Sequence, residues 1–127
     1  FGAEVTGVCS AANLELVRSL GACQVLDYTA AGFDIGAGLY DVVLDAVGKL
    51  DPSRGKRALK KTGVYLNVLK DSGSAERMSE FLALKDLAEA GMIRPVIDRF
   101  YRLEQIVEAH RYVDTGHKRG NVVIEVA

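Results

Sequence analysis

The residues whose types could support chemistry are few and lie far apart along the chain. Ser10 follows the apolar run Glu4–Cys9 and precedes a segment with helical spacing, so its hydroxyl could cap a helix or donate to an anion there. Tyr28 ends the next apolar run, either as an amphipathic edge residue or as an aromatic face beside a bound base. Asp45 lies inside an apolar segment, with no neighbouring group that would make it a general base. Spacing alone therefore offers three separate polar candidates.

Motifs that carry catalysis in other proteins are missing from this sequence. The fingerprint G-x-G-x-x-G does not occur, and Gly32, Gly36 and Gly38 lie in a loop, not between a strand and a helix start. There is no G-x-S-x-G segment, no cysteine–histidine nucleophile pair and no pair of carboxylates at a useful spacing. Two cysteines and two histidines without metal-ligand spacing predict no metal site. The sequence alone shows no catalytic constellation.

Composition and charge exclude several classes of partner. The chain has 127 residues, 49% of them hydrophobic and 26% charged, which is typical of a globular protein. Sixteen basic against seventeen acidic residues give a net charge of −1, which argues against binding nucleic acid or a membrane through bulk charge. No apolar run is long enough to span a membrane, and no signal peptide is recognisable. Cys9 and Cys23 are too few for a disulfide framework, so we expect a reducing, cytoplasmic location.

The first part of the chain alternates predicted strands with predicted helices. The strands are Glu4–Cys9, Gln24–Tyr28, Asp41–Val47 and Val64–Leu69, and helices follow Ser10 and run from Asp51 to about Lys61. This alternation predicts an α/β fold with a mostly parallel sheet, flanking helices and right-handed crossovers. Ligands of such sheets bind at the carboxyl ends of the strands, which here are Cys9-Ser10, Tyr28, Val47-Gly48 and Leu69.

The second part of the chain predicts a long helix and then a strand–helix–strand segment. The long helix covers Ala75–Ala90, Pro95–Tyr101 is extended, and Leu103–Thr115 is helical with His110 on its apolar, core-facing side. Asn121–Val126 is the final strand. We place a domain boundary between residues 91 and 92.

Four segments together resemble the medium-chain dehydrogenase/reductase superfamily, in its quinone oxidoreductase and zinc-type alcohol dehydrogenase-like branch. They are EVTGVCSAANLELVRSLGACQVLDY, YDVVLDAVG, GVYLNV and AGMIRPVIDRFYRLEQIVEAHRYVDTGHKRGNVVIEV. The resemblance implies that residues 1–91 are part of an NADP(H)-binding Rossmann-like region and that residues 92–127 return to a catalytic domain. It also implies hydride transfer from the nicotinamide to a small-molecule substrate, a quinone, enone or carbonyl compound.

The resemblance assigns cofactor-binding roles to particular residues. Ser10 matches a contact of the adenosine 2′-phosphate, Asn13 could reach the same place, and Tyr28 matches the tyrosine beside them. The remaining matches, all near the cofactor, are Val47, Gly48, Gly63, Tyr65, Lys118 and Arg119. Relatives often carry a basic residue near Ala12 or Asn13, and its absence here weakens the prediction of NADP preference. No catalytic residue or metal ligand is expected within these 127 residues.

The same resemblance predicts a structural problem. In the Rossmann strand order a first strand lies in the middle of the sheet, and here it would come upstream of Phe1. Glu4–Cys9 and Asp41–Val47 would then face an empty position with unpaired backbone groups. We expect the two strands to pair directly, with a homodimer as a further expectation and strand donation or a longer parent chain as alternatives. The 127 residues alone are expected to be inactive, or else to form a non-catalytic interaction or regulatory module.

Overall fold

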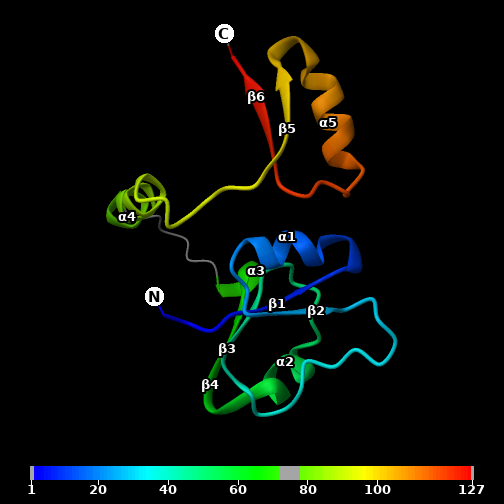
Figure 1. The fold of residues 1–127 in the computed structure, drawn as a ribbon, viewed down its shortest axis with the longest axis vertical. Helices are drawn as coiled ribbons and strands as arrows, with labels where there is room; N and C mark the ends of the chain where they lie inside the picture. The colour runs from blue at the N-terminus through cyan, green and yellow to red at the C-terminus, as the bar shows by residue number, and fades with distance from the viewer. Residues whose placement is uncertain (1, 72–77, 127) are drawn as a thin grey trace. The chain divides into compact units, whose positions relative to one another are not determined.

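The computed structural model describes residues 2–71 and 78–126, which fall into two compact units, Phe1–Arg77 and Met78–Ala127 (Figure 1). Each unit is an arrangement of short parallel strands with helices beside them. The α/β fold class predicted from the alternation of strands and helices is therefore confirmed. The predicted boundary between residues 91 and 92 stays a prediction.

The first unit begins with a strand–helix–strand segment. β1 (Thr6–Cys9) leads through the single turn η1 (Ala11–Asn13) into α1 (Leu14–Ser19), and β2 (Gln24–Asp27) returns parallel to β1. Gly7 lies under the Val17 side chain, where a larger residue would collide with it. This close approach holds α1 against β1.

A second strand–helix–strand segment completes the first unit. β3 (Tyr40–Asp45) is followed by α2 (Pro52–Ala58), β4 (Leu59–Asn67) and the short helix α3 (Val68–Asp71), with β3 and β4 parallel. Asp51 caps α2 as predicted, because its carboxylate accepts the backbone N–H of Ser53 at 2.7 Å.

The predicted end of the α2 helix at Lys61 is wrong. The backbone becomes extended at Leu59, and β4 begins there. Lys60 lies in the strand, and its ammonium group pairs with Asp41 of the neighbouring strand at 2.8 Å. Pairing across the sheet thus overrides the weak helical preference of the lysines.

The expectation that β1 and β3 pair directly is also wrong. In the described part of the chain β1 pairs with β2 and β3 pairs with β4, as two separate two-stranded sheets. A cavity of about 790 Å³ lies between them and is lined by residues of both β1 and β3. The two strands therefore border this cavity without pairing with each other.

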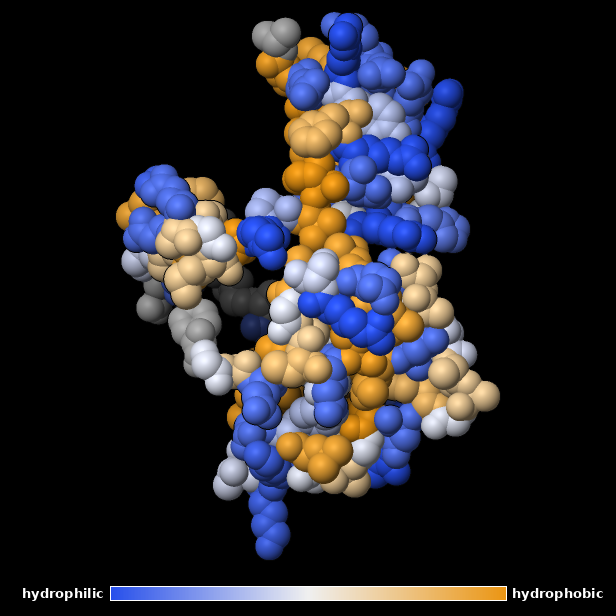
Figure 2. Space-filling view, in the orientation of Figure 1, coloured by the Kyte–Doolittle hydropathy of each residue, from blue (hydrophilic) through white to orange (hydrophobic). Residues whose placement is uncertain are grey.

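The second unit contains a helix and a strand–helix–strand segment. α4 (Met78–Glu89) comes first, followed by β5 (Ile97–Arg102), η2 (Leu103–Gln105), α5 (Ile106–Asp114) and β6 (Asn121–Glu125), with β5 and β6 parallel. α5 lies along one face of this sheet (Figure 1). Apolar side chains remain at the surface along β5 and β6 (Figure 2), with Phe100 60% exposed.

The prediction that His110 of α5 belongs to the core is wrong. His110 is exposed, whereas Ala109, on the same predicted apolar face, is buried. The His110 prediction rested on apolar spacing, but a helix beside a two-stranded sheet has a narrow contact surface and leaves the neighbouring position in solvent.

Few apolar side chains are buried in the described residues. Ile35, Ala58 and Ala109 are the apolar residues classed as buried. The accessible surface is 10028 Å², whereas two separate compact units sharing a mass of 13.7 kDa would expose roughly 8,000 Å². The strands therefore keep much of their apolar surface open.

Candidate functional site

Three of the predicted residues come together where β1 and β2 end. The backbone N–H of Tyr28 donates to the carbonyl of Cys9 at 3.0 Å, which fixes Tyr28 beside the chain that leads into η1. The backbone N–H of Asn13 donates to the carbonyl of Ser10 at 2.9 Å, closing a tight turn. The Asn13 side-chain amide donates to the Ser10 hydroxyl at 3.5 Å, the long limit of a hydrogen bond. Parallel pairing of β1 and β2 thus produces the grouping of Ser10, Asn13 and Tyr28.

The polar groups of this cluster are largely unused within the chain. Ser10 occupies the position before η1, but its hydroxyl makes no capping hydrogen bond to the turn. Asn13 Oδ1 is buried and has no hydrogen-bond partner in the described structure. Tyr28 is 56% exposed, so its ring is open to a ligand. A hydroxyl, an amide oxygen and an aromatic face are groups that can recognise a ribose and a base.

Sequence reasoning missed Asp27, which adds a negative charge to this cluster. Its carboxylate accepts the backbone N–H and the hydroxyl of Thr29 at 2.8 and 2.6 Å. Hydrogen bonds from the Thr29 side chain and backbone, and from the backbone of Ala11, lower the pKa of Asp27, so it is charged at neutral pH. The spacing Asp-x-Thr is typical of a side-chain-closed turn and was the signal available in the sequence.

A second cluster forms where β3 and β4 end, around the buried carboxylate of Asp45. Asp45 Oδ1 accepts the backbone N–H groups of Val47 at 3.2 Å and Gly48 at 2.8 Å, and Asp45 Oδ2 accepts that of Leu50 at 3.1 Å. Burial raises the pKa of Asp45, but the hydrogen bonds from Gly48, Val47 and Leu50 outweigh it and leave the pKa below its ordinary value. A charged carboxylate therefore holds the predicted cofactor turn Val47-Gly48 in one conformation.

The carboxylate of Asp45 is also reached by two side chains of β4. The Asn67 amide donates to Asp45 Oδ2 at 3.0 Å, and the Tyr65 hydroxyl lies 3.3 Å from the same atom. Asn67 Oδ1 accepts the backbone N–H of Leu69 at 2.9 Å. The turns after β3 and β4 are thereby connected through Asp45 and Asn67.

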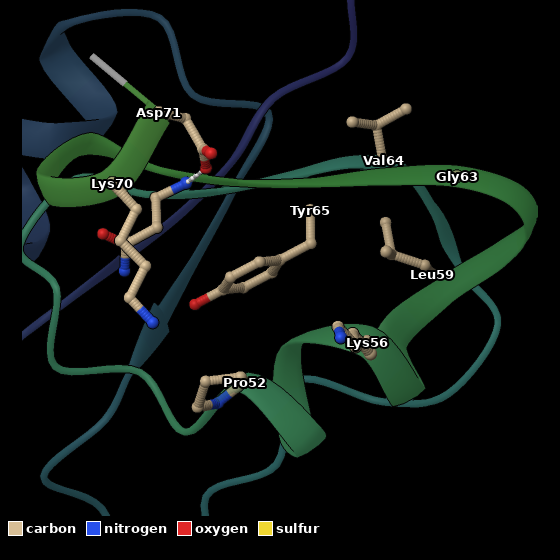
Figure 3. Close-up of a pocket in the computed structure, with 9 residues that line it drawn as sticks. Pro52, Lys56, Leu59, Gly63, Val64, Tyr65, Lys70 and Asp71 are labelled. Carbon is tan, nitrogen blue, oxygen red and sulfur yellow. Dashed lines mark hydrogen bonds between the residues drawn. The ribbon is translucent and has the colours of Figure 1, made fainter.

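Tyr65 and Gly63 lie along a separate cavity of about 580 Å³ on the α2 side of β4 (Figure 3). The Tyr65 ring extends into it, and Lys70 and Pro52 lie beyond its hydroxyl. Gly63 lies in the middle of β4, four residues before Asn67, and a Cβ atom there would stand 2.9 Å from the Tyr40 carbonyl oxygen. Gly63 therefore lies away from Val47 and Gly48. The Tyr65 hydroxyl, by contrast, contacts Asp45, whose carboxylate binds the backbone of both residues.

Lys118 and Arg119 belong to the second unit, where Asp98 binds the backbone of Arg119. Asp98 Oδ2 accepts the backbone N–H of Arg119 at 2.8 Å and the Tyr112 hydroxyl at 2.7 Å. The Lys118 ammonium donates to the Gly120 carbonyl at 3.3 Å. These contacts order the loop before β6 and connect it to α5, within its own unit.

Across residues 2–71 and 78–126, no cluster of three or more histidine, cysteine, aspartate or glutamate side chains is arranged to hold a metal ion. In the same residues, no helix is long and apolar enough to cross a membrane.

Comparison with known proteins finds relatives that are named as oxidoreductases. Residues 70–124 match the family model described as zinc-binding dehydrogenase. The chain is 32% identical to the mouse (Mus musculus) protein named NAD(P)H oxidoreductase RTN4IP1, mitochondrial, covering 99% of this chain and 42% of that protein. It is 31% identical to the Arabidopsis thaliana NADPH-dependent alkenal/one oxidoreductase, chloroplastic, covering 98% of this chain and 34% of that protein.

A solved structure supports the fold. A crystal structure of an NAD-dependent alcohol dehydrogenase superposes with a TM-score of 0.81 at 22% identity, covering 100% of this chain and 45% of that one. The chain thus spans less than half the length of these known proteins.

Parallel strands joined by crossover helices, with polar groups gathered at the strands' carboxyl ends, define a Rossmann-like α/β protein. The chain belongs to the medium-chain dehydrogenase/reductase superfamily, as its sequence predicted, and the relatives that it matches are named as oxidoreductases.

Proposed function

We propose that the chain forms part of an NADP(H)-dependent oxidoreductase and binds the adenosine end of the cofactor with Ser10, Asn13 and Tyr28. The grouping of these three residues at the carboxyl ends of β1 and β2, with the Tyr28 ring 56% exposed beside them, is the observation that carries the proposal.

The residues of the cluster fit an adenosine moiety by their hydrogen-bonding capacity. The Ser10 hydroxyl can donate to a phosphate or ribose oxygen, and the Tyr28 ring can cover one face of the base. When bound, the nicotinamide cofactor supplies hydride transfer to a quinone, enone or carbonyl compound. Within this chain the residues bind and orient; none is proposed to touch the reacting carbon.

The turn Val47-Gly48, which belongs to the second cluster, also supports the proposal. Its backbone N–H groups are committed to Asp45, so the turn has a fixed shape at the carboxyl end of the sheet, where ligands of such folds bind. We propose that this turn, with Tyr65 behind it, approaches the cofactor; Lys118 and Arg119 stay proposed cofactor-binding residues of the second unit. Gly63 is included in the proposal as a residue that permits close strand packing.

Titration of NADPH fluorescence tests the proposal. The unmodified chain should bind NADPH, and Ser10→Ala should weaken binding by about five- to tenfold, the loss of one charge-assisted hydrogen bond. Ser19→Ala is the matched control, because Ser19 is exposed and its hydroxyl only donates to the Leu16 carbonyl. Failure of the folded, unmodified chain to bind at millimolar NADPH would reject the site.

A non-catalytic interaction module is the competing function. It is favoured by the lack of a recognisable catalytic constellation in the sequence. Turnover of NADPH with a panel of quinones by the purified 127-residue chain would overturn it. The cytoplasmic location and the homodimer stay predictions; the mouse and Arabidopsis relatives are named as mitochondrial and chloroplastic.

A further inference from the structure

The cavity of about 580 Å³ on the α2 side of β4, which we call the α2 cavity, carries two positive charges that the chain does not neutralise (Figure 3). Lys56 of α2 and Lys70 of α3 both line it. Within residues 2–71 and 78–126 neither ammonium group forms an ion pair, whereas Arg57, the residue after Lys56, is paired with Asp34. Two unpaired ammonium groups at one cavity favour an anionic ligand.

Asp71 is the acidic residue that lines the α2 cavity, and its carboxylate is already used by the backbone. Asp71 Oδ2 accepts the backbone N–H of Asn67 at 2.6 Å, at the point where β4 ends and α3 begins (Figure 3). The two lysines outnumber this carboxylate, so the lining has a net positive charge. An anion that enters the cavity therefore meets more attraction than repulsion.

The remaining lining is mostly apolar and includes an aromatic ring. Pro52 of α2 and Leu59 and Val64 of β4 line the cavity, and the Tyr65 ring extends into it (Figure 3). Gly55 of α2 packs against the Tyr65 ring so closely that a Cβ atom there would collide with it. The ring is thus held in place by α2, and a flat apolar ligand can contact it.

The size and the mixed lining of the α2 cavity select among anions. Its volume falls within the range of roughly 300–1,000 Å³ that is typical of small-molecule sites. An inorganic anion would leave Leu59 and Val64 uncovered, and a neutral apolar compound would leave both ammonium groups without a counter-charge. A compound with a carboxylate at one end of a flat ring satisfies both parts of the lining.

We propose that the α2 cavity binds a small aromatic carboxylate, whose ring lies against Tyr65 and whose carboxylate pairs with Lys70, while Lys56 adds a second attraction. Lys70 has the main role because it lies beyond the Tyr65 hydroxyl, at the polar end of the ring (Figure 3). None of the residues proposed to bind the adenosine end lines the cavity, and neither does the turn after β3. The proposal therefore does not depend on cofactor binding. The cavity does share Gly63 and Tyr65 with the residues assigned to the cofactor, so NADPH is included as a competitor.

Fluorine-19 NMR with 4-fluorobenzoate tests the proposal on the unmodified chain. The resonance should shift or broaden saturably, with a dissociation constant in roughly the millimolar range for so small a ligand. 4-Fluorobenzamide has the same ring without the charge and should bind at least about fivefold more weakly. Inorganic phosphate carries the charge without the ring and should not displace 4-fluorobenzoate at equal concentration.

Variants at exposed lysines localise the binding. Lys70→Met removes the charge but keeps most of the side-chain length, and it should weaken 4-fluorobenzoate binding by about three- to fivefold. Lys56→Met should weaken it by about twofold, because Lys56 acts only through longer-range attraction. Lys61→Met is the matched control, because Lys61 is an exposed lysine of β4 that does not line the cavity.

The two kinds of control separate this site from the cofactor site. Binding of 4-fluorobenzoate that persists in Ser10→Ala and at millimolar NADPH would support the proposal. Displacement by NADPH would place the compound in the cofactor site and overturn it, and displacement by inorganic phosphate would overturn it by showing that charge alone is recognised. Absence of binding, equal binding of 4-fluorobenzamide, unchanged binding in Lys70→Met or an equal loss in Lys61→Met would overturn it as well.

Discussion

The Asn67 side-chain amide donates a hydrogen bond to Asp45 Oδ2 at 3.0 Å, from the end of one parallel strand to the end of its neighbour. Asp45 holds the turn after β3 through three backbone N–H groups, and Asn67 holds the turn after β4 through that of Leu69. Both side chains are buried, at 6% and 7% exposure. One hydrogen bond thus joins the two turns that form this end of the sheet.

Replacing Asp45 should destabilise the first unit. Asp45→Ala removes the acceptor of three backbone N–H groups and of the Asn67 amide, so we expect the free energy of unfolding to fall by about 2–4 kcal/mol. Asp45→Asn keeps one acceptor oxygen and should cost about half as much. Urea denaturation measures both. Equal, near-zero effects would show that solvent replaces the Asp45 hydrogen bonds without loss.

The pKa of Asp45 predicts how stability depends on pH. Because the folded state lowers this pKa below its ordinary value of 3.8, the charged group contributes its full stabilisation above that value. The contribution is lost as pH falls through the folded pKa. Other lowered carboxylates, such as Asp27, titrate in the same range, so the quantity to measure is the difference between the parent and Asp45→Asn. That difference should shrink as pH falls from 5 to 2; a constant difference would contradict the prediction.

Gly48 should be more sensitive to substitution than another glycine with the same backbone conformation. Gly48 has a φ of 74° and Gly32 has a φ of 76°, both unfavourable for other residues. A Cβ at Gly48 would collide with the Leu69 side chain, whereas a Cβ at Gly32 meets nothing within 4 Å. Gly32→Ala should cost about 1 kcal/mol and Gly48→Ala about 2–3 kcal/mol by thermal or urea unfolding. Equal costs would show that Leu69 simply rotates away.

The strand–helix alternation was readable from the sequence because each element carries its own local signal. Asp51 before Pro52 marks the start of α2, and apolar β-branched residues mark β3. The end of α2 was not readable, because Lys60 joins a strand through pairing with Asp41, nineteen positions earlier. Local propensity cannot report a partner that distant.

Only part of the candidate site could be predicted from the sequence, because the remaining residues act through contacts that local sequence signals do not report. Ser10 and Tyr28 could be chosen because they follow apolar runs, and parallel pairing then brings them together. The roles of Asp27 and Asp45 depend on which backbone N–H groups their carboxylates meet, and these lie in turns whose shape the sequence did not specify. The strand order predicted that β1 and β3 would face an unfilled position, but the further prediction that the two strands pair directly was wrong, because each pairs, among the described strands, only with the strand that follows it.

Asp27 should reduce the preference for NADPH over NADH. Its charged carboxylate lies by the turn that contains Ala11, next to the proposed place of the adenosine end. A 2′-phosphate there would experience like-charge repulsion that a ribose diol would not. Asp27→Asn should therefore tighten NADPH binding by about three- to tenfold and leave NADH binding nearly unchanged. Fluorescence titration of both cofactors measures this. An equal effect on NADPH and NADH binding would show that the Asp27 charge does not act on the 2′-phosphate.

Asp98 should control the ionisation of Tyr112 and the order of the loop that carries Lys118 and Arg119. The Tyr112 hydroxyl donates to Asp98 at 2.7 Å, and this hydrogen bond is the main cause that raises the pKa of Tyr112 above 10 and lowers that of Asp98. Asp98→Asn removes the negative charge that disfavours the phenolate, so the pKa of Tyr112 should fall toward its ordinary value. The Arg99 guanidinium lies 3.7 Å from the Tyr112 ring centroid and lowers this pKa, so the pKa of Tyr112 in Asp98→Asn should be lower while Arg99 is present than in its absence. Carbon-13 NMR of labelled tyrosine follows this titration directly.

Amide exchange at Arg119, whose N–H donates to the same Asp98 carboxylate, should become faster in Asp98→Asn. An unchanged Tyr112 titration in Asp98→Asn would show that the hydrogen bond between them does not persist in solution.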